Sequence, residues 1–156
     1  RSDMAFLSSM NIVASGMTAQ QLRLDVVAEN VTNSTTTRTE AGGPYRRKMV
    51  VFQSVAGRDD FRAAMARAAE GLTPNAGAPT AGGVRVTQIV EDPSPMKLVY
   101  DPTHPDANED GYVEMPNVDM VKEMTDAMAA TQAYSANVTA FNTLKSVVAK
   151  GLEIGR

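Results

Sequence analysis

The segment from Asp106 to Gly111 has the residue types of a calcium-binding loop. Its sequence, DANEDG, matches the opening D-x-[DN]-x-[DN]-G pattern, in which side-chain oxygens and a tight glycine turn surround the ion. A complete EF-hand loop also supplies a bidentate carboxylate at its twelfth position, which is Asn117 in this chain. An ordinary turn leading into the last helix is therefore favoured. A calcium-binding or general protein-interaction module using Asp106–Gly111 is the alternative function.

The lone histidine, His104, is the other candidate for chemistry. It lies close in sequence to Asp101 and Asp106, so a small hydrolase or a metal site can be constructed around it. Catalysis requires groups that converge on a substrate, and the sequence contains no Gly-rich phosphate loop and no nucleophile elbow. Zero cysteines exclude thiolate zinc sites and cysteine nucleophiles. We therefore expect no catalytic residues, no metal and no cofactor, and the protein is not expected to be an enzyme.

Charge is distributed unevenly along the chain. Ten acidic residues stand against two basic ones between Glu91 and Asp126, although the whole chain has a net charge of −3. Much of the compensating positive charge lies between Arg38 and Arg67, and this stretch includes the triplet Arg46-Arg47-Lys48. Two oppositely charged patches would suit head-to-tail packing between copies, and two solvated surfaces are the other interpretation. The acidic balance argues against nucleic acid as a partner.

On a strand, the triplet Arg46-Arg47-Lys48 is expected to form an exposed face or to contact an acidic neighbour. Binding of phosphate or of an acidic surface is the functional alternative for these side chains.

The N-terminal region has a clear heptad periodicity. Apolar positions alternate at spacings of four and three, with one polar interruption at Gln20, along Phe6, Met10, Val13, Met17, Gln20, Leu24, Val27 and Val31. This pattern predicts a helix from about Met4 to Asn33. The turn-forming residues Asn33 to Thr37 end it.

The C-terminal region repeats the pattern, and we expect a helix from about Val118 to Glu153. Pro116-Asn117 provides a stop and an N-cap, and Asp119 favours the first turn through the helix dipole. The heptad track runs through Met120, Met124, Ala127, Thr131, Tyr134, Val138, Phe141, Lys145, Val148 and Leu152. Apolar residues beside the track, such as Val121 and Met128, indicate that this helix needs more than one partner.

The segment between the helices has a different composition. Strands are predicted at 45–52, 84–90 and 97–100, with a hairpin-like connection at 91–95. We expect a short helix at 59–70, a mobile linker at 73–83 and a polar loop at 101–111. The predicted fold class is therefore α+β. Two long terminal helices, 4–34 and 117–154, form a coiled-coil-like pair as one discontinuous axial domain, and a small β-rich insert spans 35–116.

The composition suggests that the core of this chain is incomplete. Aromatic residues make up only 5%, tryptophan is absent, and methionine occurs ten times. Aromatic rings normally supply much of a core's buried area, whereas methionine is common on adaptable contact surfaces. We therefore expect the apolar helix stripes to pack against neighbouring subunits. No apolar run is long enough to span a bilayer, and the first 25 residues do not resemble a signal peptide.

Several motifs resemble those of the bacterial flagellar rod and hook protein family. The N-terminal signature of that family is similar to residues 14–24 (ASGMTAQQLRL) and 28–33 (AENVTN), where Thr32 replaces the usual small residue of N-[IV]-A-N. Other motifs resemble those of the family's proximal-rod subunits, namely 42–48 (GGPYRRK), 89–95 (IVEDPSP), 99–102 (VYDP), 104–107 (HPDA), 111–113 (GYV), 115–118 (MPNV), 136–142 (ANVTAFN) and 152–155 (LEIG). The resemblance extends from about Phe6 to Gly155.

The resemblance implies a structural subunit of the hollow drive shaft that crosses the periplasm in the flagellar basal body. Members of the family leave the cell through the flagellar type III export apparatus without a cleaved signal peptide. Their terminal helices pack as a coiled coil around the inner tube, and the insert forms an outer layer. The implied partners are copies of the chain, other rod subunits, membrane-ring and rod-junction proteins at the base, and the export apparatus. No nucleic acid and no direct membrane insertion are implied.

The expected subunit-interface residues lie on the two heptad tracks and at the asparagines of the family motifs. The asparagines Asn30, Asn33, Asn137 and Asn142 are expected to fix register through polar contacts, as buried asparagine does in coiled coils. The full set is Phe6, Met10, Val13, Met17, Leu24, Val27, Asn30, Val31, Asn33, Met120, Met124, Tyr134, Asn137, Val138, Phe141, Asn142, Val148 and Leu152.

Overall fold

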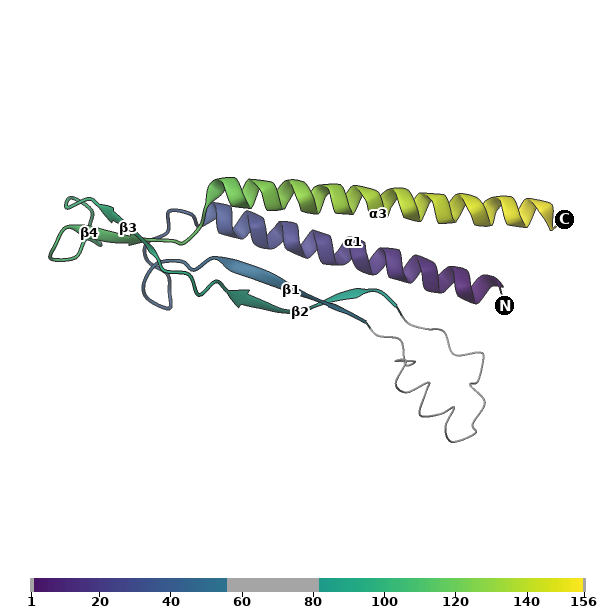
Figure 1. The fold of residues 1–156 in the computed structure, drawn as a ribbon, viewed down its shortest axis with the longest axis horizontal. Coiled ribbons are helices and arrows are strands. Elements are labelled where there is room, and N and C mark those ends of the chain that lie inside the picture. The colour runs from purple at the N-terminus through teal and green to yellow at the C-terminus, as the bar shows by residue number, and fades with distance from the viewer. Residues whose placement is uncertain (1, 56–81, 156) are drawn as a thin grey trace, which may run out of the picture. The chain divides into compact units, whose positions relative to one another are not determined.

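The computed structural model describes residues 2–55 and 82–155 of the chain (Figure 1). In chain order, the described elements are α1 (Ser2–Thr32), β1 (Lys48–Ser54), β2 (Val84–Glu91), β3 (Lys97–Tyr100), β4 (Tyr112–Met115) and α3 (Met120–Ile154). Two long terminal helices enclose a small β region in the sequence, so the predicted α+β class is confirmed. The predicted helix at 59–70 and residues 73–81 of the predicted linker lie outside the described residues.

The strands form two separate two-stranded sheets. Strand β1 pairs with β2, and β3 pairs antiparallel with β4, with Lys97 opposite Met115 and Tyr100 opposite Tyr112. The predicted hairpin between β2 and β3 is therefore wrong. Pro93 and Pro95 have no N–H to donate to a sheet, and the backbone N–H of Asp92 instead donates to the carbonyl of Arg47 at 2.7 Å.

The described chain divides into two compact units. Among the described residues, the first unit comprises 2–20, 52–55, 82–86 and 133–155, and the second comprises 21–51 and 87–132. Each long helix contributes residues to both units.

In the first unit, small residues permit close approaches. A Cβ at Gly16 would lie 3.0 Å from Nδ2 of Asn137, so these two positions of α1 and α3 are neighbours. Gly83 has a φ of +129°, which disfavours a side chain, and a Cβ at this position would lie 2.6 Å from the Ser15 hydroxyl. That hydroxyl accepts a hydrogen bond from the Val84 N–H at 3.1 Å, and this bond fixes the start of β2 against α1.

In the second unit, α1 and α3 run antiparallel. Asn30 of α1 contacts Glu123 of α3, and Arg23, which precedes Asn30, contacts Asp126, which follows Glu123. The buried apolar side chains of this unit are few, and Tyr45 is the largest of them. They are Val26, Val27, Tyr45, Val113, Pro116, Val118 and Ala130.

The helix ends lie within two residues of their predicted positions, but the cap of α3 is different. Asp119, rather than Asn117, caps this helix, because its carboxylate accepts hydrogen bonds from the N–H groups of Val121 at 3.0 Å and Lys122 at 3.4 Å. At the end of α1, the Asn33 side chain donates to the carbonyl of Glu29 at 3.0 Å. The Asn117 side chain instead contacts the backbone of Arg47, Asp92 and Ser94.

Candidate functional site

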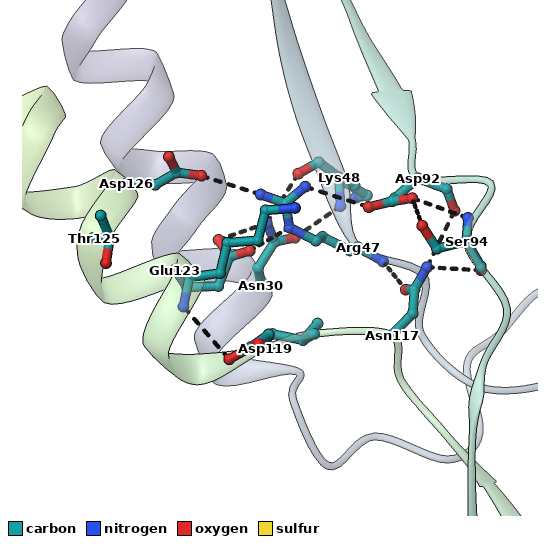
Figure 2. A network of polar contacts seen from close by, with 12 residues as sticks. Asn30, Arg47, Lys48, Asp92, Ser94, Asn117, Asp119, Glu123, Thr125 and Asp126 are labelled. Atoms are coloured by element: carbon teal, nitrogen blue, oxygen red, sulfur yellow. Dashed lines mark hydrogen bonds and ion pairs between the residues drawn. The ribbon is translucent and has the colours of Figure 1, made fainter.

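Arg47 is the centre of a buried cluster of polar side chains in the second unit (Figure 2). Its Nε donates to the carboxylate of Glu123, and its terminal nitrogens donate to Asp126 at 3.1 Å and to Asp92 at 3.4 Å. Arg47 is 5% exposed and Glu123 is 0% exposed. The planar fork of the guanidinium presents several N–H donors, so one arginine can serve three carboxylates. The residue before β1, the residue after β2 and the start of α3 are joined at this point.

The electrostatic balance of the cluster favours a permanently charged Arg47. A second arginine, Arg23, donates to Asp126 at 3.0 Å, so two guanidinium groups pair with the three carboxylates of Glu123, Asp126 and Asp92 and leave one negative charge in excess. Burial alone would lower the pKa of Arg47, but the hydrogen bond and the charge of Glu123, with the charges of Asp126 and Asp92, raise this pKa above its ordinary value.

Asn30 connects α1 to the same cluster. Its side-chain nitrogen donates to Glu123 at 3.1 Å and to the carbonyl of Lys48 at 2.9 Å. Its side-chain oxygen accepts hydrogen bonds from the Lys48 N–H and from the Tyr45 hydroxyl, both at 2.9 Å. With 1% of its surface exposed, Asn30 is fully paired, and it binds the backbone of β1 as a neighbouring strand would.

Asn117 and Asp92 extend the cluster to the turn after β2. The Asn117 side chain accepts from the Arg47 N–H at 2.8 Å and donates to the carbonyls of Asp92 and Ser94, both at 3.1 Å. The Asp92 carboxylate accepts from the hydroxyl and the N–H of Ser94. These two bonds, with a further contribution from Arg47, lower the pKa of Asp92 below its ordinary value.

Tyr45 closes the cluster beside Lys48. Burial of the phenol, together with the charges of Glu29, Glu123 and Glu91, raises the pKa of Tyr45 to about 12. The ammonium of Lys48 lies 5.7 Å from the centre of the Tyr45 ring and also pairs with Glu29 at 2.5 Å.

The geometry of this cluster is that of a structural junction. Each charged group in it is turned towards another member, whereas a catalytic group must face a substrate. In the described part of the chain, the one buried side-chain polar atom without a partner is Oε1 of Gln20, which lies outside the cluster. Removing one member of such a network leaves buried polar groups unpaired and strongly destabilises the fold. The network therefore specifies how α1, α3 and the strand ends meet.

The predicted interface residues occupy three kinds of environment. Two are buried within the chain, namely Val27 and Asn30. Twelve are half-buried, namely Phe6, Met10, Val13, Met17, Leu24, Val31, Asn33, Tyr134, Asn137, Val138, Phe141 and Val148. Four are exposed, namely Met120, Met124, Asn142 and Leu152. The exposed set is uncovered within the subunit, and its part in contacts between subunits stays a prediction.

The face of α3 that is most covered within the second unit differs from the predicted track. Glu123 and Ala130 are buried there, whereas Met120, Met124 and Thr131 of the predicted track are exposed. Asn137 continues the spacing of seven residues begun by Glu123 and Ala130, and it lies beside Gly16 in the first unit. The role of the four motif asparagines in contacts between subunits stays a prediction.

The loop that resembles a calcium site is used for local contacts. The Asp106 carboxylate accepts from the Thr37 hydroxyl at 2.8 Å and pairs with Arg38 at 3.3 Å. Asn108 accepts from the N–H groups of Asp110 and Tyr112. No group of three or more His, Asp or Glu residues in the described ranges is placed to hold a metal ion, so the geometry gives the calcium alternative no support.

His104 is likewise part of a turn. Its Nδ1 accepts from the N–H of Asp106 at 3.1 Å. The Asp101 carboxylate is occupied by the hydroxyl and the N–H of Thr103, which hold its pKa below the ordinary value.

The buried cluster was not identified from the sequence, although the segment from Tyr45 to Arg47 contained a signal for it. Tyr45 and Arg47 are buried and Arg46 between them is exposed, which is the alternation of a strand-like segment. Of the two structural expectations for the triplet, contact with an acidic neighbour is correct for Arg47. Glu123 was not singled out because a charged residue on a helix is normally exposed.

Two family models match the chain, and both describe flagellar rod proteins. The model described as "Flagella basal body rod protein" matches residues 10–38, and "Flagellar basal body rod FlgEFG protein C-terminal" matches residues 109–154. The matched segments include most of α1 and all of α3. The class of protein that these helices define is therefore the structural rod proteins of the flagellum.

Curated relatives define the family more narrowly. The flagellar basal-body rod protein FlgC of Bacillus subtilis is 47% identical, with 98% of this chain and 100% of the relative covered. The FlgC protein of Borreliella burgdorferi is 41% identical, with 97% of this chain and 98% of the relative covered. The FlgC protein of Salmonella typhimurium is 40% identical, with 98% of this chain and 100% of the relative covered. The chain belongs to the FlgC family of flagellar basal-body rod proteins, which are structural subunits of the rod. None of its described helices combines the length and apolar character of a membrane span.

Proposed function

We propose that this chain is a non-enzymatic subunit of the proximal rod and assembles with copies of itself and with other rod subunits. The observation that carries the proposal is the apolar surface left on α3, where Val121, Met124 and Met128 are 74%, 61% and 72% exposed. Large apolar side chains grouped on one helix face mark a protein interaction site. The saturated cluster around Arg47 supports a structural role over a catalytic one.

The proposal assigns separate tasks to the parts of the chain. The helical segments 4–34 and 117–154 form the axial domain that contacts neighbouring subunits, and the insert 35–116 forms an outer layer. The 18 predicted interface residues are the candidates for these contacts. In this proposal, the subunit reaches the periplasmic part of the basal body through the type III export apparatus, without a cleaved signal peptide. It meets membrane-ring and rod-junction proteins at the base of the rod.

Complementation of motility tests this function. In a strain whose own copy of the gene is deleted, the wild-type chain should restore swimming and complete basal bodies under the electron microscope. Met128→Asp, which places a charge in the exposed apolar face of α3, should reduce swimming at least tenfold without lowering the exported amount.

Gln88→Asp is the matched control, because it adds the same charge at an exposed position of β2 rather than on the apolar face of α3. It should swim as the wild type does. Failure of the wild-type chain to restore rods, with normal export, would contradict the proposed function.

A further inference from the structure

Outside the terminal helices, one sheet face of the second unit is left open. Strands β3 and β4 lie side by side, with Leu98 opposite Glu114 and Tyr100 opposite Tyr112 (Figure 1). Side chains directly opposite each other in an antiparallel pair, and side chains two apart along one strand, lie on the same face of a sheet. These four side chains therefore share one face, which we call the tyrosine face.

The tyrosine face is turned away from the core of its unit. Val113 alternates with Tyr112 and Glu114 along β4, so it lies on the opposite face, and it is only 1% exposed. By contrast, Leu98, Tyr100 and Tyr112 are 64%, 65% and 43% exposed. Large apolar and aromatic side chains grouped on one exposed face mark a site of protein contact, and tyrosine is enriched at such sites.

The aromatic rings of this face are held in place within the chain. The rings of Tyr100 and Tyr112 meet edge to face, with their centroids 5.3 Å apart. Gly111 has a φ of +79°, and a Cβ at this position would lie 3.0 Å from the Tyr100 ring, so the loop backbone packs against that ring. The Asn108 side chain accepts from the Tyr112 N–H at 2.8 Å. A rigid aromatic surface loses little conformational entropy on binding, so these rings suit an anchor for a partner.

Carboxylates surround the tyrosine face without a matching positive charge. Glu114 lies on the face, Glu109 and Asp110 lie in the loop before β4, and all three are exposed. Within residues 2–55 and 82–155, no basic side chain pairs with any of these three carboxylates. Lys97, the one basic residue of β3 and β4, lies on the opposite face and donates to the carbonyl of Val118 at 2.6 Å. The tyrosine face therefore combines apolar side chains with uncompensated negative charge.

This combination favours a basic protein segment as the partner. An arginine or lysine side chain can lie over a tyrosine ring and pair with a carboxylate beside it, so the face offers both contacts at once. The phosphates of an anionic lipid or a nucleic acid would be repelled. A second copy is also disfavoured, because the second unit of each copy contains thirteen acidic and seven basic residues, a net charge of −6.

We propose that the tyrosine face binds a different protein, through a segment in which an arginine or lysine stands next to an apolar side chain. The apolar side chain packs on Leu98 and Tyr100, and the cation pairs with Glu114 and lies against the ring of Tyr112. The proposal rests on the proposed rod function for the presence of other proteins around the subunit. It adds a contact surface outside the terminal helices and the chemistry by which that surface selects its partner.

Site-specific cross-linking in motile cells is the first test. Leu98 is replaced by the photoreactive residue p-benzoylphenylalanine in the full chain, which is expressed in a strain that lacks its own copy of the gene. The cross-linked peptide is identified by mass spectrometry in purified basal bodies. It should come from another protein and contain a lysine or arginine next to the linked position. The same photoreactive residue at Gln88, an exposed position of β2, should not give this product.

Charge reversal tests how the partner is recognised. Glu114→Lys places a cation against the cation of the partner, so the yield of the Leu98 cross-link should fall about tenfold or more. Glu91→Lys makes the same change at the exposed end of β2 and should leave the yield unaltered. Both variants should keep the wild-type midpoint of urea unfolding. In the Glu114→Lys background, changing the linked lysine or arginine of the partner to glutamate should restore the cross-link.

The proposal is overturned if Leu98 gives no cross-link, or if the link joins a second copy, a lipid or a glycan. It is also overturned if Glu114→Lys leaves the yield unchanged, or if charge reversal in the partner does not restore the link. Any of these results, in cells whose swimming the wild-type chain restores, would leave the rod function intact. Failure of the wild-type chain to restore rods would instead contradict the rod function.

Discussion

The guanidinium of Arg47 and the carboxylate of Glu123 form a buried ion pair between residues 76 positions apart in the sequence. Arg47 precedes β1, and Glu123 lies in the first turn of α3, so the pair fixes how the β region meets the C-terminal helix (Figure 2). Arg47 also pairs with Asp92 and Asp126, so one guanidinium joins three carboxylates.

Replacing Arg47 should destabilise the fold strongly. Arg47→Met leaves three carboxylates near one another without their shared cation, and breaking a buried ion pair costs about 3–5 kcal/mol. The free energy of unfolding, measured with urea, should fall by this amount.

Arg46→Met is the matched control, since Arg46 is the exposed neighbour of Arg47. Its effect should stay within about 0.5–1 kcal/mol. Equal losses in the two variants would show that the cluster does not stabilise the subunit.

Alkaline pH should weaken the fold through Tyr45. The pKa of Tyr45 is raised from 10.0 to about 12, so between these values the native state holds a proton that the unfolded state releases. The contribution is present below pH 10 and is lost as pH rises towards 12, with a total on the order of 2 kcal/mol. Urea midpoints from pH 9 to 12 measure the effect.

Tyr45→Phe should remove this part of the alkaline slope. It should also cost about 1 kcal/mol at neutral pH, because the hydrogen bond to Asn30 is lost. An unchanged slope in Tyr45→Phe would assign the alkaline loss to other groups.

Acid stability should depend on the bond from Ser94 to Asp92. Because the folded-state pKa of Asp92 is lowered, its contribution to stability is present above the ordinary pKa of 3.8 and is lost as pH falls through the lower folded value. Ser94→Ala should therefore reduce the free energy of unfolding by about 1–3 kcal/mol at pH 7 and by much less at pH 2.

Ser135→Ala serves as the comparison, because Ser135 is an exposed residue of α3. Its effect should be the same at both pH values. A loss in Ser94→Ala that does not change with pH would contradict an interaction with the ionised carboxylate.

Gly16 and Asn137 should show coupled effects in the first unit. Alanine favours a helix by about 1 kcal/mol over glycine, but a Cβ at Gly16 would lie 3.0 Å from the Asn137 side chain. Gly16→Ala should therefore be nearly neutral in the wild type and stabilising by about 1 kcal/mol in an Asn137→Ala background.

A double-mutant cycle with thermal unfolding measures this coupling. If Gly16→Ala gives the same change in both backgrounds, the two positions are not in contact.

The long helices and the short β3 could be read from local sequence with good accuracy. A heptad repeat and a flanking cap depend on residues a few positions apart, so they do not require knowledge of the fold. Strand β4, at Tyr112–Met115, was missed because four residues next to a polar loop give too short a pattern. Its pairing with β3, and the separate pairing of β1 with β2, depend on contacts between distant segments.

The choice of buried face on α3 could not be obtained in the same way. Two faces of this helix are apolar enough to be buried, and the methionines made the predicted track the more attractive one. The fold instead buries Glu123 and Ala130 and leaves Met120 and Met124 exposed. A carboxylate is a poor choice for a core until a guanidinium is placed against it, and Arg47 reaches that position only through the chain's tertiary path.

Local periodicity and family motifs were thus sufficient for the helices, the α+β class and membership of the rod proteins. Packing between distant segments determined which helix face is covered, where the ion pairs form, and which apolar side chains stay available for a neighbour. The physical reason is that helix propensity acts over one or two turns. The cost of burying a charge, by contrast, is set by a partner that lies 76 residues away in the chain.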